Sequence, residues 1–542
     1  MSYIDLFFSA SQQTQQIILL VNVLFVVYYL ATINVENKVA IYGGAMLALI
    51  LLYIAVNFFS GIGVKLFIIF YQLPAIFIST LLYLLYKKLI VKYIPEKPLT
   101  TYQIRIPLKN GKNIIVDIIK GVSIQGASGS GKTISTAGWI LYWLGFRSMP
   151  LLVYDYKNFE LTEIVNYFYR EATLPIHYFS LGQPDKSIRI NPIDPKIIQK
   201  KEDLIVMVKS LTDNLIPDTE KGDKFFVEAC EGAIAGVVTR LREDYPHYCS
   251  YSYLAGIFLT KDAEELVDFI SRNLEASIEA RAFLDSASSG RQMAGVKATL
   301  SNAFRKINIP AVFYLMDRND IDLAINKTES RCVLSLVNTP KYDDVYSPIL
   351  GVVAQAVIQS VSDRGREPMC LLIDEAPTIR IQKIQRVVAT MRSFGIATVY
   401  MIQDKIQTAN QMGEAKMKEL LANLSTLFFG KTNDPDTAKF FESYFPEVKR
   451  KQKAISRGSG VFAKGEARVT VSERDEKQHK SFEMFKRSTG QFFVFDEKGN
   501  SFDANIKKPH IEIEEIRSIN SITEWELTRY YQVILSNAKN LK

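Results

Sequence analysis

Residues 126–133 have the types and the spacing of a loop that holds phosphate groups. They read Gly-Ala-Ser-Gly-Ser-Gly-Lys-Thr and fit the pattern G-x-x-x-x-G-K-[ST] at every fixed position. The glycines let backbone N–H groups surround phosphates, the lysine reaches the outer phosphates, and the threonine hydroxyl can bind Mg²⁺. A glycine-rich turn that binds nothing is the alternative. The pattern favours ATP with Mg²⁺, bound by Gly126, Ala127, Ser128, Gly129, Ser130, Gly131, Lys132 and Thr133.

Two acids that follow an apolar run form a second candidate site. The run Met369–Ile373 is directly followed by Asp374 and Glu375. In nucleotide hydrolysis one carboxylate holds Mg²⁺, usually through water, and another orients or deprotonates the attacking water. We assign the metal to Asp374 together with Thr133, and the catalytic role to Glu375 together with Lys132. The alternative is that the two acids cap the next helix.

Two further residues are catalytic candidates. Gln403 follows the apolar run Ala397–Ile402, at the end of a predicted strand, where ligands of open α/β sheets collect. Its amide could sense the γ-phosphate, or it could be a simple polar cap. Arg392 could reach the nucleotide of a neighbouring subunit as an arginine finger, which raises rates by about 10³- to 10⁵-fold where it operates. An exposed surface arginine is the alternative.

The segment Lys449–Arg468 is strongly basic. It holds seven Lys or Arg residues and one acid, Glu466, with Ser-Gly turns at 458–460. A flexible basic loop of this kind suits the phosphate backbone of a nucleic acid without reading its sequence. A loop that only increases solubility is the alternative. The candidate DNA contacts are Lys449, Arg450, Lys451, Lys453 and Arg457.

The elements around these residues indicate an α/β fold. Gly121–Gln125 is predicted as a short buried strand and the chain from Ile134 onward as helix, which places the loop at a helix N-terminus. Strand-like and helix-like segments alternate after it, so we expect a RecA-like P-loop domain with a parallel sheet and helices on both faces. The other predicted strands are Leu151–Tyr154, Ile176–Phe179, Arg331–Leu336, Met369–Ile373, Ala397–Met401, Leu427–Gly430 and Gln491–Phe495.

A long stretch of amphipathic helical pattern interrupts this alternation. The 242 positions that separate Lys132 from Asp374 exceed what a compact nucleotide fold needs, so an insertion is required. We expect an all-α insertion domain at 196–319, inside a nucleotide-binding domain formed by 95–195 and 320–510, and a C-terminal tail at 511–542.

Three apolar runs at 17–33, 39–59 and 66–86 are predicted to cross a membrane. The second and third have 21 residues each, about 31 Å as helix, which matches a hydrocarbon core of about 30 Å. The first is shorter and contains Asn22, so two or three spans, and the side of the N-terminus, stay open. Lysines at 87, 88 and 92 follow the third run and predict a cytoplasmic location for everything after it.

The bulk composition excludes some classes of protein. The net charge of +8 is mild for 542 residues, so charge matters through its local distribution. The four cysteines are scattered, without a CxxC pair or metal-ligand spacing to the four histidines. This pattern argues against a disulfide framework or a zinc site and is typical of reduced thiols in the cytosol.

Taken in order, these features resemble the coupling proteins of conjugative type IV secretion, the TraG/TraD group. Asp155–Glu160 is similar to the family's D-x-K-G-E segment, with Asn158 in place of the glycine. Ile190–Ile193 resembles its N-P-L turn, and Phe429–Ala438 resembles its late G-x-x-D-x-x-T-A region. Three spans, instead of two with a larger outer loop, also depart from the family pattern.

The resemblance implies a hexameric ATPase of the bacterial inner membrane, multi-pass, with its ATPase domain in the cytoplasm. It would receive a single DNA strand bound to a relaxase and pass it to the proteins of a type IV secretion channel. The helical insertion would contact the relaxosome.

Two other functions compete with this one. The first is a chromosome-segregation-type translocase of duplex DNA, which normally ends in a winged-helix domain that the residues after 490 do not resemble. The second is a receptor or gate for protein secretion that nucleotide switches. Glu375 argues against a pure switch, because a protein that only binds nucleotide needs no acid to activate water.

Overall fold

The computed structural model describes residues 9, 98–216, 224–287, 289–456 and 468–542. Of the two units into which the chain divides, Met1–Pro98 and Leu99–Lys542, the second contains nearly all of them. The predicted membrane spans at 17–33, 39–59 and 66–86 lie outside the described residues.

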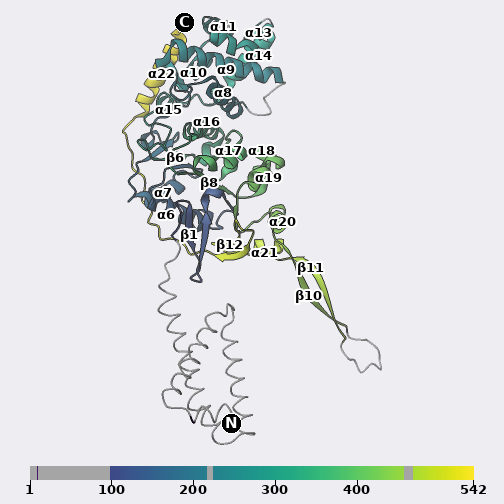
Figure 1. Cartoon of the computed structure of the whole chain (residues 1–542). Coiled ribbons are helices and arrows are strands. Elements are labelled where there is room, and N and C mark those ends of the chain that lie inside the picture. Colours follow the sequence, from purple (N-terminus) through teal and green to yellow (C-terminus); the bar gives the residue numbers. More distant parts are fainter. Residues whose placement is uncertain (1–8, 10–97, 217–223, 288, 457–467) are drawn as a thin grey trace. The chain divides into compact units, whose positions relative to one another are not determined.

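A nine-stranded sheet organises this second unit (Figure 1), with the strand order β13-β12-β9-β3-β8-β7-β4-β6-β5. Seven neighbouring strands are parallel, as the sequence pattern predicts. They are β3 (Val122–Gln125), β4 (Leu151–Asp155), β5 (Ile176–Ser180), β6 (Val333–Val337), β7 (Met369–Ile373), β8 (Ile396–Ile402) and β9 (Thr426–Phe429).

The expectation of a purely parallel sheet is wrong at one edge. There β12 (Gln491–Phe495) pairs antiparallel with β9 and with β13 (Ser501–Asn505). A short turn joins β12 to β13, and a connection of this length can only join antiparallel neighbours. The strand predicted at 491–495 is thus part of the central sheet.

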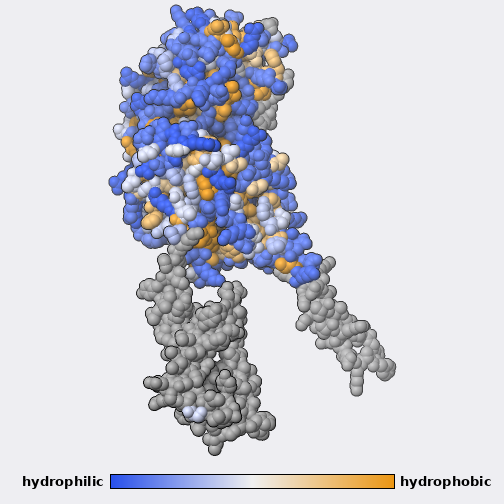
Figure 2. Space-filling view, in the orientation of Figure 1, coloured by the Kyte–Doolittle hydropathy of each residue, from blue (hydrophilic) through white to orange (hydrophobic). Residues whose placement is uncertain are grey.

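Successive side chains of each strand point to opposite faces of the sheet, so an apolar core forms on both faces. In β4, Leu151 and Val153 join one buried cluster, whereas Leu152 and Tyr154 join another on the opposite face. Strands buried on both faces read as nearly continuous apolar runs, which is why they could be found in the sequence. The surface visible in Figure 2 is mainly hydrophilic.

Helices cover the two faces. The first face carries α6 (Gly138–Phe146) and α7 (Glu160–Tyr169), whose apolar residues share one cluster with the strands. The second face carries α16 (Asp343–Val361). In the described part of the chain, Pro340–Val361 is the one helix long and apolar enough to span a membrane, and it is mostly buried as a core helix. The α-helices between β7 and β12 are α17 (Ile384–Met391), α18 (Lys405–Met412), α19 (Glu414–Ala422), α20 (Pro435–Ser443) and α21 (Ser481–Phe485).

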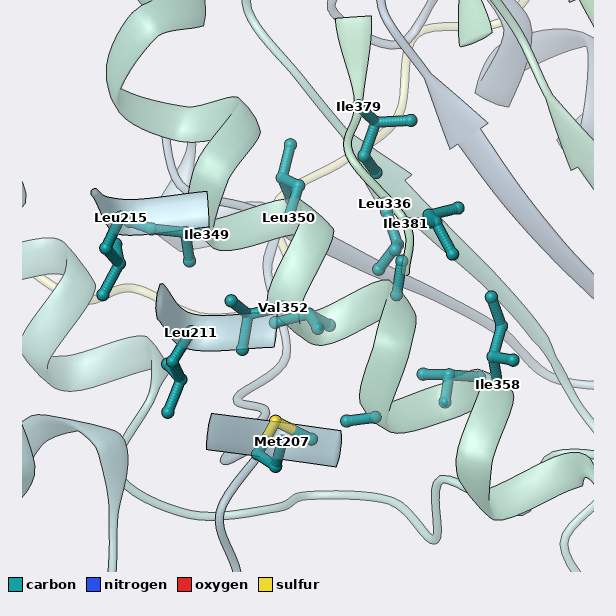
Figure 3. Packing of buried hydrophobic residues seen from close by; sticks show 14 of the residues in the cluster. Met207, Leu211, Leu215, Leu336, Ile349, Leu350, Val352, Ile358, Ile379 and Ile381 are labelled. Carbon is teal, nitrogen blue, oxygen red and sulfur yellow. The ribbon is translucent and has the colours of Figure 1, made fainter. Parts of the chain in front are cut away.

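The described residues between 201 and 315 contain helices and no strand. The first of them, α8, lays Met207, Leu211 and Leu215 at a spacing of four against α16 (Figure 3). Helix α8 therefore attaches the helical region to the core of the sheet. These helices are α8 (Lys201–Leu215), α9 (Lys224–Asp244), α10 (Tyr251–Thr260), α11 (Ala263–Ser271), α12 (Leu274–Glu279), α13 (Arg281–Ser286), α14 (Gly290–Lys306) and α15 (Pro310–Leu315).

The C-terminal segment 511–542 is not a separate tail. Its helix α22 (Glu524–Asn540) packs against α10 and α15. The Tyr530 hydroxyl donates to Asp317 Oδ2 at 2.5 Å, and the Tyr531 ring meets Phe313 edge-on at 4.9 Å. The chain thus leaves the sheet after β13 and returns to the helical region.

The basic segment is a β-hairpin where the structure describes it, not a flexible loop. Strand β10 (Glu447–Ser456) pairs antiparallel with β11 (Arg468–Lys477), and positions 457–467, which include Arg457, lie outside the described residues. Lys449 is opposite Asp475 and Lys451 is opposite Glu473 in the register. Opposite charges at paired positions favour strand pairing, which the count of basic residues alone does not reveal. A smaller hairpin joins β1 (Gln103–Pro107) to β2 (Asn113–Asp117).

Helices α6 and α7 approach closely at Gly145, and this contact predicts a stability change. A Cβ there would overlap the carbonyl oxygen of Phe168, so we expect Gly145→Ala to lower the thermal unfolding midpoint. Overpacking typically costs about 1–3 kcal/mol. The matched control is Gly290→Ala in α14, where a Cβ meets nothing within 4 Å and the midpoint should hold or rise. Equal midpoints for the two variants would contradict the close contact.

Candidate nucleotide site

The candidate residues gather because three neighbouring strands are parallel. In the sheet, β8 lies between β3 and β7, and the three point the same way. Their carboxyl ends therefore share one edge, where open α/β sheets bind ligands. Residues 126–133 follow β3, Asp374 and Glu375 follow β7, and Gln403 follows β8.

Contacts from distant segments hold the phosphate loop in place. The Gly126 N–H donates to Ile402 O at 3.1 Å, and the Ala127 N–H donates to Lys431 O at 2.7 Å. Gly131 has a left-handed φ of 94°, and a Cβ there would lie 2.8 Å from the nitrogen of Gly490. Only glycine combines that backbone angle with that approach. Residue 431, inside the segment 429–438 that resembles the family's late motif, and residue 490, which no motif singles out, thus support the loop.

Three side chains converge on Glu375. Gln403 Nε2 donates to Glu375 Oε1 at 2.9 Å. Lys132 Nζ lies 3.8 Å from the same oxygen and donates to the Gly126 carbonyl at 2.5 Å. Lys157 Nζ lies 3.5 Å from it as well. Three of the four predicted catalytic residues are thus together in one chain, and Lys157 joins them.

Asp374 and Glu375 are both buried, with only 2% of each exposed. Burial, which has the largest effect, and the nearby carboxylates of Glu375 and Asp155 together raise the pKa of Asp374 to about 7. Burial also lowers the pKa of Lys132, against the opposing pull of Glu375 and Asp374. The site therefore concentrates charges that water solvates poorly.

Several buried oxygens at the site have no hydrogen-bond partner within the described residues. They are Asp374 Oδ1, Glu375 Oε2, Ser130 Oγ and Ser135 Oγ. Buried polar atoms are normally paired, so such a group needs an explanation such as a ligand. Oxygen ligands suit Mg²⁺, and the half-buried Thr133 lies next to Lys132 in the loop. The residues present fit a nucleotide with Mg²⁺.

The backbone is strained beside the acids. Glu375 has a φ of +42°, an uncommon value for a residue with a side chain. The Asp374 N–H donates to Tyr154 O at 3.0 Å, and the Thr378 hydroxyl donates to Glu375 O at 2.8 Å. Such strain persists only where the surroundings hold it, and it clusters at functional sites.

The segment Asp155–Glu160 explains how Lys157 reaches the site. The Asp155 carboxylate is buried and accepts from the Lys157 N–H and from the N–H and hydroxyl of Thr162. Asn158 and Phe159 then have φ values of +49° and +75°. Glycine favours this region, and asparagine enters it more readily than most residues. The asparagine that replaces the family's glycine is therefore compatible with the turn.

The structure does not bring Arg392 to the site of its own chain. Arg392 is exposed in a turn that precedes β8, near Asp117 and Lys120, at the amino ends of the parallel strands. The nucleotide residues lie at the opposite, carboxyl ends. A contact with a neighbouring subunit's nucleotide stays a prediction.

Comparisons with known proteins show what the chain is similar to. The family model "Type IV secretion-system coupling protein DNA-binding domain" matches residues 118–482, more than half of the chain. No curated protein matches.

Solved structures of one protein, the bacterial conjugative coupling protein TrwB, share the fold. The unbound TrwBdeltaN70 form has a TM-score of 0.58 at 15% identity and covers 79% of this chain and 92% of that chain. The complex of TrwB with ADP and Mg²⁺ has a TM-score of 0.56 at 15% identity, over 79% and 92%. The complex with the ATP analogue ADPNP has a TM-score of 0.56 at 15% identity, over 79% and 93%. At this identity the similarity establishes the fold, and the predicted α/β P-loop fold is confirmed.

The raised pKa of Asp374 predicts a pH dependence of stability. The folded protein keeps a proton up to about pH 7 that the unfolded chain releases near its ordinary value of 3.8. This contribution to stability is complete below pH 3.8 and is lost as the pH rises to about 7. The asparagine of Asp374→Asn does not titrate. Without nucleotide, the thermal midpoint of this variant should therefore rise relative to that of the wild type as the pH increases from 5 to 7.5. A constant difference between the two midpoints would exclude the raised pKa.

Proposed function

This chain belongs to the type IV secretion-system coupling proteins, and on that premise we propose that it is an ATPase that drives the transfer of a single DNA strand during conjugation or mobilisation. One observation carries the proposal. Lys132 of the phosphate loop, Lys157 and Gln403 all contact one oxygen of Glu375, whose other oxygen has no hydrogen-bond partner among the described residues.

Each residue then has a distinct role in ATP hydrolysis. The backbone of residues 126–133 surrounds the phosphates, and Lys132 moves from the Gly126 carbonyl to the outer phosphates. Thr133 and Asp374 would hold Mg²⁺, which would neutralise charge on the phosphate oxygens. Glu375 orients the attacking water and accepts its proton, because its second oxygen has no hydrogen-bond partner among the described residues. Gln403 detects the γ-phosphate through its contact with Glu375.

Further parts of the proposal rest on the family and on the sequence. The runs at 17–33, 39–59 and 66–86 anchor the protein in the bacterial inner membrane, with the ATPase domain in the cytoplasm. The chain forms a homo-hexamer in which Arg392 reaches a neighbour's nucleotide. It binds single-stranded DNA with its relaxase, and the proteins of the secretion channel. The domain division is that expected from the sequence: 95–195 and 320–510 for nucleotide, 196–319 for the insertion, and 511–542, whose helix α22 returns to the insertion.

Two substitutions test the site in the purified full-length protein. Lys132→Ala should abolish binding of a fluorescent ATP analogue, because the loop loses its cation. Glu375→Gln should still bind the analogue but hydrolyse ATP about 10²- to 10⁴-fold more slowly, which is the usual contribution of a general base. Hydrolysis is measured by phosphate release with and without single-stranded DNA.

The matched control is Glu171→Gln, the same substitution at an acid whose side chain is 89% exposed. It should retain the wild-type rate. Full hydrolysis by Glu375→Gln would exclude the proposed role of the acid. A wild-type rate that DNA does not raise would exclude coupling to DNA.

A further inference from the structure

A basic cleft lies where the helical region meets the two segments that follow Glu375 and Gln403. Its volume is about 630 Å³. Helix α8, residues 380–386 and the α18–α19 junction form its walls. Five of the side chains that line it are cationic and one is acidic: Lys209, Arg380, Lys383, Arg386 and Lys416, with Asp213.

An alternating pattern after Glu375 places these cations at the cleft. Ile379, Ile381 and Ile384 are buried, and Figure 3 shows the first two beside the apolar cluster of α16. The residues between them, Arg380, Gln382 and Lys383, line the cleft together with the accessible parts of Ile381 and Ile384. The same pattern that fills the core therefore presents a polar and basic edge.

The single acid is already engaged by the protein. Asp213 lies 3.3 Å from Lys209 Nζ and accepts from Gln382 Nε2 at 2.6 Å. Lys383, Arg386 and Lys416 are exposed, and in the described part of the chain no carboxylate lies within ion-pair distance of them. Lys383 also has a φ of +51°, which is strained for a residue with a side chain. The cleft therefore keeps three positive charges available for a ligand.

Two segments that line the cleft start at the hydrolysis site. Residues 376–383 follow Glu375, and residues 404–412, which contain helix α18, follow Gln403; Glu375 and Gln403 are hydrogen-bonded to each other. The two segments are joined again at the cleft, where Gln411 Nε2 donates to Ile379 O at 2.7 Å. A ligand on Lys383 thus acts on the first segment directly, and a ligand on Lys416 of α19 acts on the second through the contact of α19 with α18.

We propose that this cleft binds the phosphodiester backbone of single-stranded DNA through Lys383, Arg386 and Lys416, and that residues 376–383 and helix α18 couple this binding to the position of Glu375. The proposal rests on the proposed function. The described residues that line the cleft include no aromatic side chain on which a base could stack, so the contact is with the backbone and independent of sequence.

The hairpin β10–β11 is the competing site for DNA. Its basic positions 449 and 451 are opposite the acidic positions 475 and 473, while 450 is opposite the basic position 474. None of the three cleft cations has an acidic partner among the described residues. Opposing acids reduce the net charge that a phosphate backbone meets. The observations therefore favour the cleft.

Three triple variants of the full-length protein, each losing three positive charges, test the assignment. The cleft variant is Lys383→Gln, Arg386→Gln and Lys416→Gln, and the hairpin variant is Lys449→Gln, Lys451→Gln and Lys453→Gln. The control variant is Arg291→Gln, Lys498→Gln and Lys508→Gln, at exposed positions outside both sites. Fluorescence anisotropy follows binding of a labelled 30-mer oligothymidylate, single or paired with oligodeoxyadenylate, from 50 to 300 mM NaCl.

The cleft variant should bind the single strand at least about tenfold more weakly than the control at 100 mM NaCl. The slope of log K against log salt should become shallower by about 2, since each lost phosphate contact on a single strand contributes about 0.7. A charge-retaining variant, Lys383→Arg, Arg386→Lys and Lys416→Arg, should restore binding and thereby separate charge from misfolding.

Equal affinity and slope for the cleft and control variants would overturn the assignment, and so would a loss confined to the hairpin variant or a preference for the duplex. If the wild type binds poly-glutamate instead of the oligonucleotide, and the cleft variant loses this binding, the assignment would be overturned in favour of an acidic protein partner. A wild-type protein that binds no oligonucleotide would contradict the proposed function itself, which the comparison among variants does not test.

Discussion

The parallel pairing of β3, β8 and β7 is the constraint on which the rest of the structure depends. It places the ends of three strands at one edge of the sheet, so a phosphate loop, two acids and an amide meet without any local sequence relation. The same pairing requires strands that are apolar on both faces, and hence helices on both sides. The insertion, the hairpins and the C-terminal helix are all attached to this arrangement.

Burial of charged groups at that edge of the sheet costs free energy of folding, and Lys132, Asp374 and Glu375 are buried there together. Desolvation of an ion costs several kcal/mol, and an ion pair recovers this only with good geometry and full hydrogen bonding. Here Lys132 lies 3.8 Å from Glu375, longer than a good hydrogen bond, while Asp374 Oδ1 and Glu375 Oε2 have no hydrogen-bond partner among the described residues. Such an arrangement stabilises the fold poorly and suits a site that a charged ligand completes. Lys157 and Gln403 hold Glu375 in place until then.

The helical region is connected to the same edge by packing and by hydrogen bonds. Helix α8 packs on α16, and Gly351 of α16 is so close to the carbonyl oxygen of Arg380 that a Cβ would lie 2.7 Å from it. Arg380 Nη1 in turn donates to the backbone oxygen of Asp213 in α8 at 2.8 Å. The segment that follows Glu375 is thus held between the sheet and the insertion. Glu375 and the residues 380–386 that line the basic cleft therefore belong to one continuous stretch of chain.

The sequence by itself determined the phosphate loop, the two acids, the buried strands and the helical character of the region 201–315, because each depends on neighbours along the chain. The tertiary structure decided the antiparallel edge at β12, the register that sets Lys449 and Lys451 opposite Asp475 and Glu473, and the return of α22 to the helical region. It also brought Lys157 and Gln403 to Glu375 and placed Arg392 at the amino ends of the parallel strands, opposite the nucleotide site. These outcomes depend on strand order and on contacts between residues hundreds of positions apart, about which local periodicity carries no information.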